Sequence, residues 1–190
     1  MSKSLKCKCK SCLISQLSNK PHLDSITLPV VPAEKVLRYI LTPPTKQQRE
    51  TFNKYRPHSK KKTKPVWGFQ SYIVFSNKEI YGPFIPDQGS PSDPTMPSRH
   101  AEIVAIKRLK SMKRSLKGAR LYCIHWNYNI LTQTWELSDG IPCKDCSLFI
   151  KKNGITKLGV SSKKDNNIIH VDIDYILTRT KPSTGRLYGS

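Results

Sequence analysis

Two short motifs in this chain bring together residue types that could do chemistry. The first is His100-Ala-Glu102, and the second is Pro142-Cys143-Lys-Asp-Cys146. Cysteines three residues apart in the first turn of a helix lie on one face, so one ion can contact both sulfurs. A histidine from elsewhere would add a third ligand, and a catalytic zinc site keeps its fourth position for water. We therefore predict that Zn²⁺ is held by His100, Cys143 and Cys146.

Glu102 is the candidate proton carrier beside this site. Because it lies two residues from His100, the two side chains cannot point along one line. A carboxylate near the zinc that is not a ligand can take a proton from water and return it to a leaving group. The alternative is a purely structural zinc site completed by Cys123 or His125. A structural site rarely needs a glutamate at this spacing, so the motif pair favours catalysis.

Several elements must position these motifs. Apolar periodicity predicts helices at 33–41, 100–115 and 143–153, with a short polar helix at 45–55. β-Branched and aromatic runs predict strands at 66–75, near 80–81, and at 119–126, 130–137, 155–161 and 168–173. Residues 127–129 are expected to form a turn. Ser98 is expected to cap the helix at 100–115, whose apolar face would contain Ile103, Ile106, Leu109 and either Lys110 or Met112.

The segments 100–106 (HAEIVAI) and 140–146 (GIPCKDC) resemble the cytidine deaminase-like superfamily, over roughly residues 66–175. The resemblance implies a three-layer α/β/α fold around a mixed sheet of five strands. It implies the role of zinc ligand for His100, Cys143 and Cys146, and the role of proton shuttle for Glu102. The expected activity is hydrolytic conversion of a cytosine base to uracil, in a nucleoside, a nucleotide or single-stranded nucleic acid. The alternatives are a basic, zinc-stabilised nucleic-acid-binding module without activity, and a tRNA-type adenosine deaminase.

The chain departs from the family pattern in three places. Family members carry an asparagine before the histidine motif, and here Asp87 or Gln88 is the only candidate for that role. The stretch between the motifs is long and contains an extra strand through Trp135. Only about six residues separate the last two strands, which predicts an antiparallel hairpin because a parallel crossover needs a dozen or more. Within the family, an antiparallel last strand resembles the free-nucleoside cytidine deaminases.

Substrate contacts are less well defined than the zinc ligands. Trp126, Tyr128 and Trp135 could stack on a base, or could pack against one another across the strands. The candidate substrate-binding residues are Asp87, Gln88, Ala101, Trp126 and Trp135.

The charge of the chain points to a polyanionic partner. Its 33 Lys and Arg residues face 13 Asp and Glu residues, giving a formal net charge of +20 that is spread along both halves. Such a field attracts nucleic acid and phosphorylated molecules. The basic loop at 56–65 contains Lys60, Lys61, Lys62 and Lys64, which are candidate nucleic-acid contacts. A solvated loop or a nuclear-localisation signal is the alternative for this loop.

The ends of the chain set further expectations. Residues 1–32 read as a basic arm and residues 33–190 as a deaminase-like domain with its core at 66–175. Cys7, Cys9 and Cys12 could bind a second metal, although a thiol-bearing arm fits their spacing better. The first residues lack the apolar core of a signal peptide, and no stretch is long enough to span a membrane. We therefore expect an intracellular protein, cytoplasmic or nuclear, with no membrane partner. Self-association into a homo-oligomer is left open.

Overall fold

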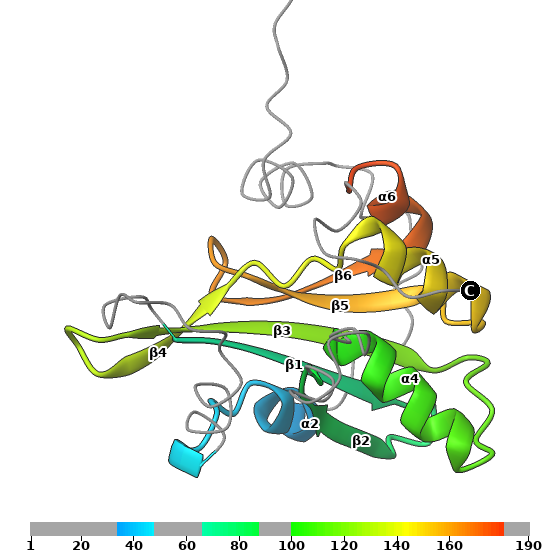
Figure 1. Ribbon diagram of the computed structural model, residues 1–190, viewed down its shortest axis with the longest axis horizontal. Coiled ribbons are helices and arrows are strands. Elements are labelled where there is room, and N and C mark those ends of the chain that lie inside the picture. Colours follow the sequence, from blue (N-terminus) through cyan, green and yellow to red (C-terminus); the bar gives the residue numbers. More distant parts are fainter. Residues whose placement is uncertain (1–33, 48–65, 88–99, 181–190) are drawn as a thin grey trace, which may run out of the picture.

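A mixed β-sheet forms the centre of the molecule (Figure 1). The structure, a computed structural model, describes residues 34–47, 66–87 and 100–180. Its strands lie in the order β2-β1-β3-β5-β6, and β4 pairs with β3. Their bounds are β1 Val66–Val74, β2 Ile80–Phe84, β3 Arg120–Asn129, β4 Thr134–Ser138, β5 Lys157–Ser162 and β6 Asn167–Asp172.

Strand direction identifies the fold class. The pairs β1–β2, β1–β3, β3–β4 and β5–β6 are antiparallel, whereas β3 and β5 are parallel. The predicted mixed α/β sheet and its antiparallel last pair are therefore confirmed. Strands β4 and β5 share one edge of β3, because β5 pairs with residues 120–123 and β4 with residues 125–129.

Helices cover both faces of this sheet and make it the middle of three layers. Helix α2 (Glu34–Ile40) packs on one face through Val36 and Ile40, in a cluster with the sheet residues Tyr72, Ile124 and Trp126. Helices α4 (Ala101–Ser111), α5 (Lys144–Lys152) and α6 (Ile173–Leu177) lie on the other face. Their core residues include Ile106, Leu109, Ile150 and Ile176, which pack with Ile73, Leu121, Leu158 and Val160 of the sheet.

Helix α4 differs from its prediction at both ends and in its buried face. His100 is the N-cap rather than the first helical residue. The helix stops at Ser111 because Met112 leaves helical geometry and Lys113 adopts a φ of 54°. The buried face contains Ala101, Ala105, Ile106 and Leu109, whereas Ile103 is half-buried and Met112 is 49% exposed. Ile106 and Leu109 of the predicted face are thus buried as expected, whereas the rest of the buried face contains the small Ala101 and Ala105 in place of Ile103 and Met112.

The hairpin after α4 corrects a second prediction. A turn was expected at 127–129, but β3 continues through Asn129 and the chain reverses over residues 130–133. The Asn129 side chain accepts hydrogen bonds from the backbone N–H groups of Leu131 and Thr132, and Gln133 has a φ of 55°. Helix α6, which follows β6, was not predicted.

Other expectations fall on residues that the structure does not describe. These are the arm at 1–32 with Cys7, Cys9 and Cys12, the loop at 56–65 with its lysines, most of the helix expected at 45–55, and Ser98 as a cap. Within the described residues, no helix combines the length and the apolar character that crossing a bilayer requires.

Candidate metal centre and active site

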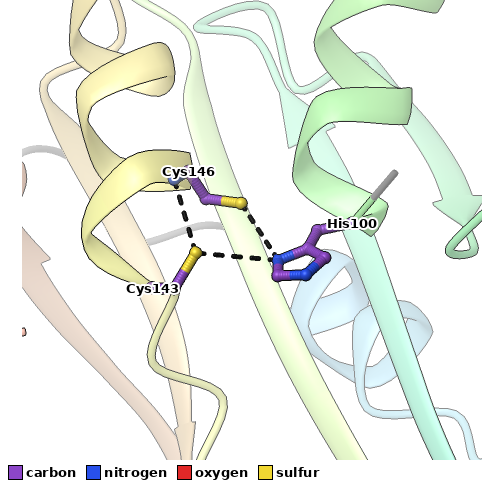
Figure 2. A group of neighbouring side chains, drawn as sticks. All are labelled: His100, Cys143 and Cys146. Carbon is purple, nitrogen blue, oxygen red and sulfur yellow. Dashed lines mark hydrogen bonds between the residues drawn. The ribbon is translucent and has the colours of Figure 1, made fainter. Parts of the chain in front are cut away.

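The two sequence motifs meet where α4 and α5 begin (Figure 2). His100 caps α4 and Cys143 caps α5, while Cys146 lies in the first turn of α5. The Nδ1 atom of His100 lies 3.7 Å from the Cys143 sulfur and 3.2 Å from the Cys146 sulfur. All three ligand atoms lie within 4.8 Å of one another. Residues far apart in the sequence are therefore brought to one point.

This cluster fits zinc in its donor set and its dimensions. Zinc bonds of about 2.3 Å to sulfur and about 2.0–2.1 Å to nitrogen place tetrahedral S and N donors about 3.6 Å apart. The two N–S distances in the structure, 3.7 and 3.2 Å, bracket that value. Among the described residues, no fourth His, Cys, Asp or Glu joins the group, and neither Cys123 nor His125 belongs to it. Three ligands and an open position are the arrangement of a catalytic zinc site.

The two thiols ionise unequally in the absence of metal. A hydrogen bond from the Cys146 thiol, opposed by burial and assisted by the contact with His100, lowers the pKa of Cys143 to about 4. The same hydrogen bond raises the pKa of Cys146, and burial raises it again. The backbone N–H of Cys146 also donates to the Cys143 sulfur, at 3.5 Å. The hydrogen bonds to the Cys143 sulfur thus favour a thiolate there, and binding of a metal to both sulfurs would release the proton that the pair retains.

Glu102 lies close to the cluster without belonging to it. It occupies the first turn of α4 and is only 6% exposed. Its negative charge contributes to the raised pKa of Cys146, after the hydrogen bond with Cys143 and burial. It also adds to the effect of burial on the pKa of Cys123, which lies beneath the cluster on β3. The carboxylate is therefore within electrostatic reach of the proposed zinc ligands.

The segment 139–142, which leads into α5, is held by contacts that the sequence did not reveal. The backbone N–H of Gly140 donates to the carbonyl oxygen of Ser161 at 2.9 Å. The Ser161 hydroxyl donates to the carbonyl of Ser138 and accepts from the backbone N–H of His125. A Cβ atom on Gly140 would lie 2.2 Å from the Cys123 carbonyl oxygen. Glycine is required here because two backbones come this close, and its place just before Ile-Pro-Cys was the only signal.

The predicted aromatic contacts lie away from the cluster. Trp126 is 4% exposed and packs against α2, on the opposite face of the sheet from the helices that carry the ligands. Its indole N–H donates to Gln70 at 3.1 Å. Trp135 packs on the same side and meets the Tyr128 ring at 5.1 Å. The structure therefore supports packing across the strands, which was the alternative, rather than stacking on a base at the metal.

The remaining candidates are placed only in part. Ala101 is buried between His100 and Glu102, and Asp87 is half-buried just after β2. Gln88 and the four lysines of the 56–65 loop lie outside the described residues. An aromatic pair that the sequence did not suggest lies on the metal side of the sheet, where the rings of Phe69 and His125 stack 3.9 Å apart.

This chain shows little detectable similarity to known proteins. No protein-family model matches the chain, and no curated protein matches it. Among solved structures, the chain is similar to the crystal structure of dCMP deaminase from the cyanophage S-TIM5 in apo form. The two chains share 20% sequence identity with a TM-score of 0.34, and the match covers 59% of this chain and 75% of the other.

Proposed function

We propose that this protein is a zinc-dependent hydrolase that converts a cytosine base to uracil. One observation carries the proposal. His100, Cys143 and Cys146 converge without a fourth protein ligand among the described residues, and the buried Glu102 lies beside them. A structural zinc site would use a fourth ligand, whereas a hydrolytic site leaves that position to water.

Zinc and Glu102 have different roles in the proposed reaction. Zinc, when bound, supplies a Lewis acid that lowers the pKa of water towards about 7. Glu102 takes one proton from the attacking water and delivers it to the ring nitrogen, and then carries the second proton of that water from the new C–OH group to the departing amine. A C–O bond forms at the ring carbon that carries the amine and its C–N bond breaks, so cytosine and water become uracil and ammonia. Glu102 is only 6% exposed, so its carboxylate is largely shielded from bulk water.

Two alternatives use the same residues differently. A tRNA-type adenosine deaminase would need the same ligands and the same glutamate, so the substrate base alone separates it from the proposal. A zinc-stabilised binding module without activity would need the ligands but not Glu102. Its weakness is the absence of a fourth ligand among the described residues.

Two features of the protein favour different forms of the substrate. A net charge of +20 exceeds what a mononucleotide requires and favours a single-stranded polymer. The antiparallel β5–β6 pair resembles the free-nucleoside enzymes instead. We propose a nucleotide or single-stranded nucleic acid as substrate and leave the choice to experiment.

Uracil formation from two pools at low salt tests the proposal, with the Glu102→Ala variant as the blank. The first pool contains cytidine, CMP and dCMP, and the second contains short cytosine-bearing strands of RNA and DNA. Turnover in the first pool alone identifies a nucleotide enzyme, and turnover in the second alone identifies a nucleic-acid editor. No turnover in either pool by the zinc-bound protein would contradict cytosine deamination and favour the alternatives.

A further inference from the structure

Four residues with no role in the proposed chemistry lie along the face of the sheet that carries the metal centre. We call them the metal-side strip: Ser71 and Phe69 on β1, with His125 and Asn127 on β3. In the strand register, Ser71 is opposite Cys123 and Phe69 is opposite His125. Asn127 lies two residues further along β3, and strand alternation places it on the same face. The strip therefore begins beside Cys123, beneath the metal centre, and leads away from it.

The middle of the strip is a fixed aromatic pair. The rings of Phe69 and His125 lie 3.9 Å apart and only 9° from parallel, and both residues are half-buried. The His125 ring is held by its Nδ1 contact with the Asp139 carbonyl at 3.3 Å. Its backbone N–H donates to the Ser161 hydroxyl. Two residues of strand place the pair about 7 Å from Cys123.

Each end of the strip carries a buried polar atom without a partner. Among the residues that the structure describes, the Ser71 hydroxyl and the Asn127 amide oxygen have no hydrogen-bond partner, and Ser71 is only 1% exposed. A buried polar group that makes no hydrogen bond destabilises the fold, so such groups are rare and call for an explanation. Two of them lie on one strip, on either side of an aromatic pair, where a bound ligand would supply their partners.

We propose that the metal-side strip is the nucleoside subsite of the proposed deaminase, an inference that rests on the proposed function. The ligand is a flat heterocycle that carries a sugar, from a free nucleotide or from a strand. Its ring packs against Phe69 and His125, since aromatic faces bind every base. The Ser71 hydroxyl bonds a polar atom at the metal end. The Asn127 amide bonds the sugar, about 13 Å of strand from Cys123.

Two apolar substitutions separate a binding role from a structural one. Replacing an unpartnered polar group by an apolar one of similar shape leaves the ligand-free fold as stable or makes it more stable. Ser71→Ala and Asn127→Leu are therefore expected to keep or raise the Tm while weakening ligand binding about tenfold each. Phe69→Ala is expected to weaken binding by at least about tenfold.

Asn129→Leu is the matched control. The Asn129 amide donates to Glu136, and its oxygen accepts from the turn, so its side chain is fully used within the hairpin. Its replacement is expected to lower the Tm and leave binding unchanged. The same strand and the same residue type thus give opposite results at the two positions.

Binding is measured on the zinc-loaded full chain in a Glu102→Gln background, which keeps the ligand unreacted. Cytidine, CMP and a short oligocytidylate are titrated by calorimetry, and Tm is measured on the same samples. Weaker binding with an unchanged or higher Tm supports the subsite even if no variant turns over substrate, a result that would sink only the proposed function. A lower Tm with unchanged binding for Ser71→Ala and Asn127→Leu overturns the subsite, even where turnover is found. A loss seen only with the oligocytidylate supports a subsite for a strand.

Discussion

At the scale of single residues, the site depends on side chains placed where a helix begins. Cys143 has extended backbone angles, φ −67° and ψ 164°, and its sulfur accepts the N–H of Cys146. The N-terminus of a helix carries a partial positive charge, so the backbone itself stabilises a thiolate at this position. The cysteine motif therefore specifies its own local structure, which is why the approach of Cys143 and Cys146 to each other could be predicted from the sequence. Glu102 could be placed beside them for the same reason, from its spacing to His100.

Zinc retention and turnover should separate in two variants. Cys143→Ser is expected to lose zinc, because a hydroxyl is a poor substitute for a thiolate ligand. Glu102→Ala is expected to keep one zinc per chain and lose about 10²–10⁴-fold in turnover, the range for a general acid–base group. Metal analysis and initial rates on the same preparations provide the measurement. Loss of zinc from Glu102→Ala would mean that this carboxylate supports the metal centre instead.

His170 on β6 should make the fold sensitive to acid. Burial lowers the pKa of His170 to about 4 from its ordinary value of 6.5, with a further contribution from the Arg120 charge. Between these values the unfolded chain binds more protons than the folded one, so stability falls as the pH is lowered through this range. His170→Phe keeps an aromatic ring beside Tyr122 and removes the titrating group.

The measurement is the fall in Tm between pH 7 and pH 5 on metal-free protein, so that acid release of zinc does not contribute. The fall is expected to be smaller in His170→Phe than in the unsubstituted chain. Equal falls in the two proteins would show that other groups account for the acid sensitivity.

At the scale of elements, Gly140 couples the sheet to the helix that carries both cysteines. Gly140→Ala would bring a Cβ atom to 2.2 Å from the Cys123 carbonyl and 2.6 Å from the Ser161 hydroxyl. The 139–142 segment must then move, and α5 moves with it. We expect a loss of about 1–3 kcal/mol in the free energy of unfolding, as for other overpacked sites, together with weaker zinc binding.

Gly154→Ala is the control for this substitution. Gly154 follows α5 with a φ of 83°, and a Cβ atom there meets nothing within 4 Å. It should cost about 1–2 kcal/mol in backbone strain alone and leave zinc affinity unchanged. Zinc titration and denaturant unfolding of both variants are the measurements. Equal zinc affinity in the two variants would contradict the coupling through Gly140.

Some features of the strands and helices could be predicted from the sequence, and others could not. The directions of the last strands followed from a short connection, and the helix starts followed from the motifs. The face of the sheet on which Trp126 lies could not be predicted. Alternation along β3 divides its side chains between two faces but does not say which face carries the proposed metal centre. The end of β3 was missed because asparagines at 127 and 129 are typical of turns, whereas only Asn129 supports one here. The partners of Gly140 come from other strands and leave no local signal.

At the scale of the whole molecule, charge is the dominant feature. Only 13 acidic residues are present to pair with 33 basic ones, so the acidic residues are too few to pair one-to-one with most of the basic ones. Several described bases do form ion pairs, such as Lys151 with Asp174 and Lys157 with Asp172. The excess is nevertheless too large for internal pairing to neutralise.

Salt should therefore decide between the two forms of substrate. A strand that makes six to ten phosphate contacts is expected to lose about 10³–10⁵-fold in affinity between 50 and 200 mM salt. A mononucleotide has too few phosphates for such a slope. Fluorescence anisotropy of a labelled single strand over this range is the measurement. A shallow slope would show that the positive charge is not used to grip a polymer.

The β3–β4 hairpin lies within the stretch between His100 and Cys143, which are 43 residues apart in the sequence. It extends beyond the helices at one end of the sheet, and Leu131 at its turn is 94% exposed (Figure 1). Each doubling of a loop costs only about 0.6 kcal/mol in closure entropy. His100 and Cys143, two of the proposed zinc ligands, are meanwhile held at the starts of α4 and α5. The turn is therefore a suitable attachment point, where a dye or an affinity tag could be inserted to immobilise or follow the protein without disturbing its proposed metal centre.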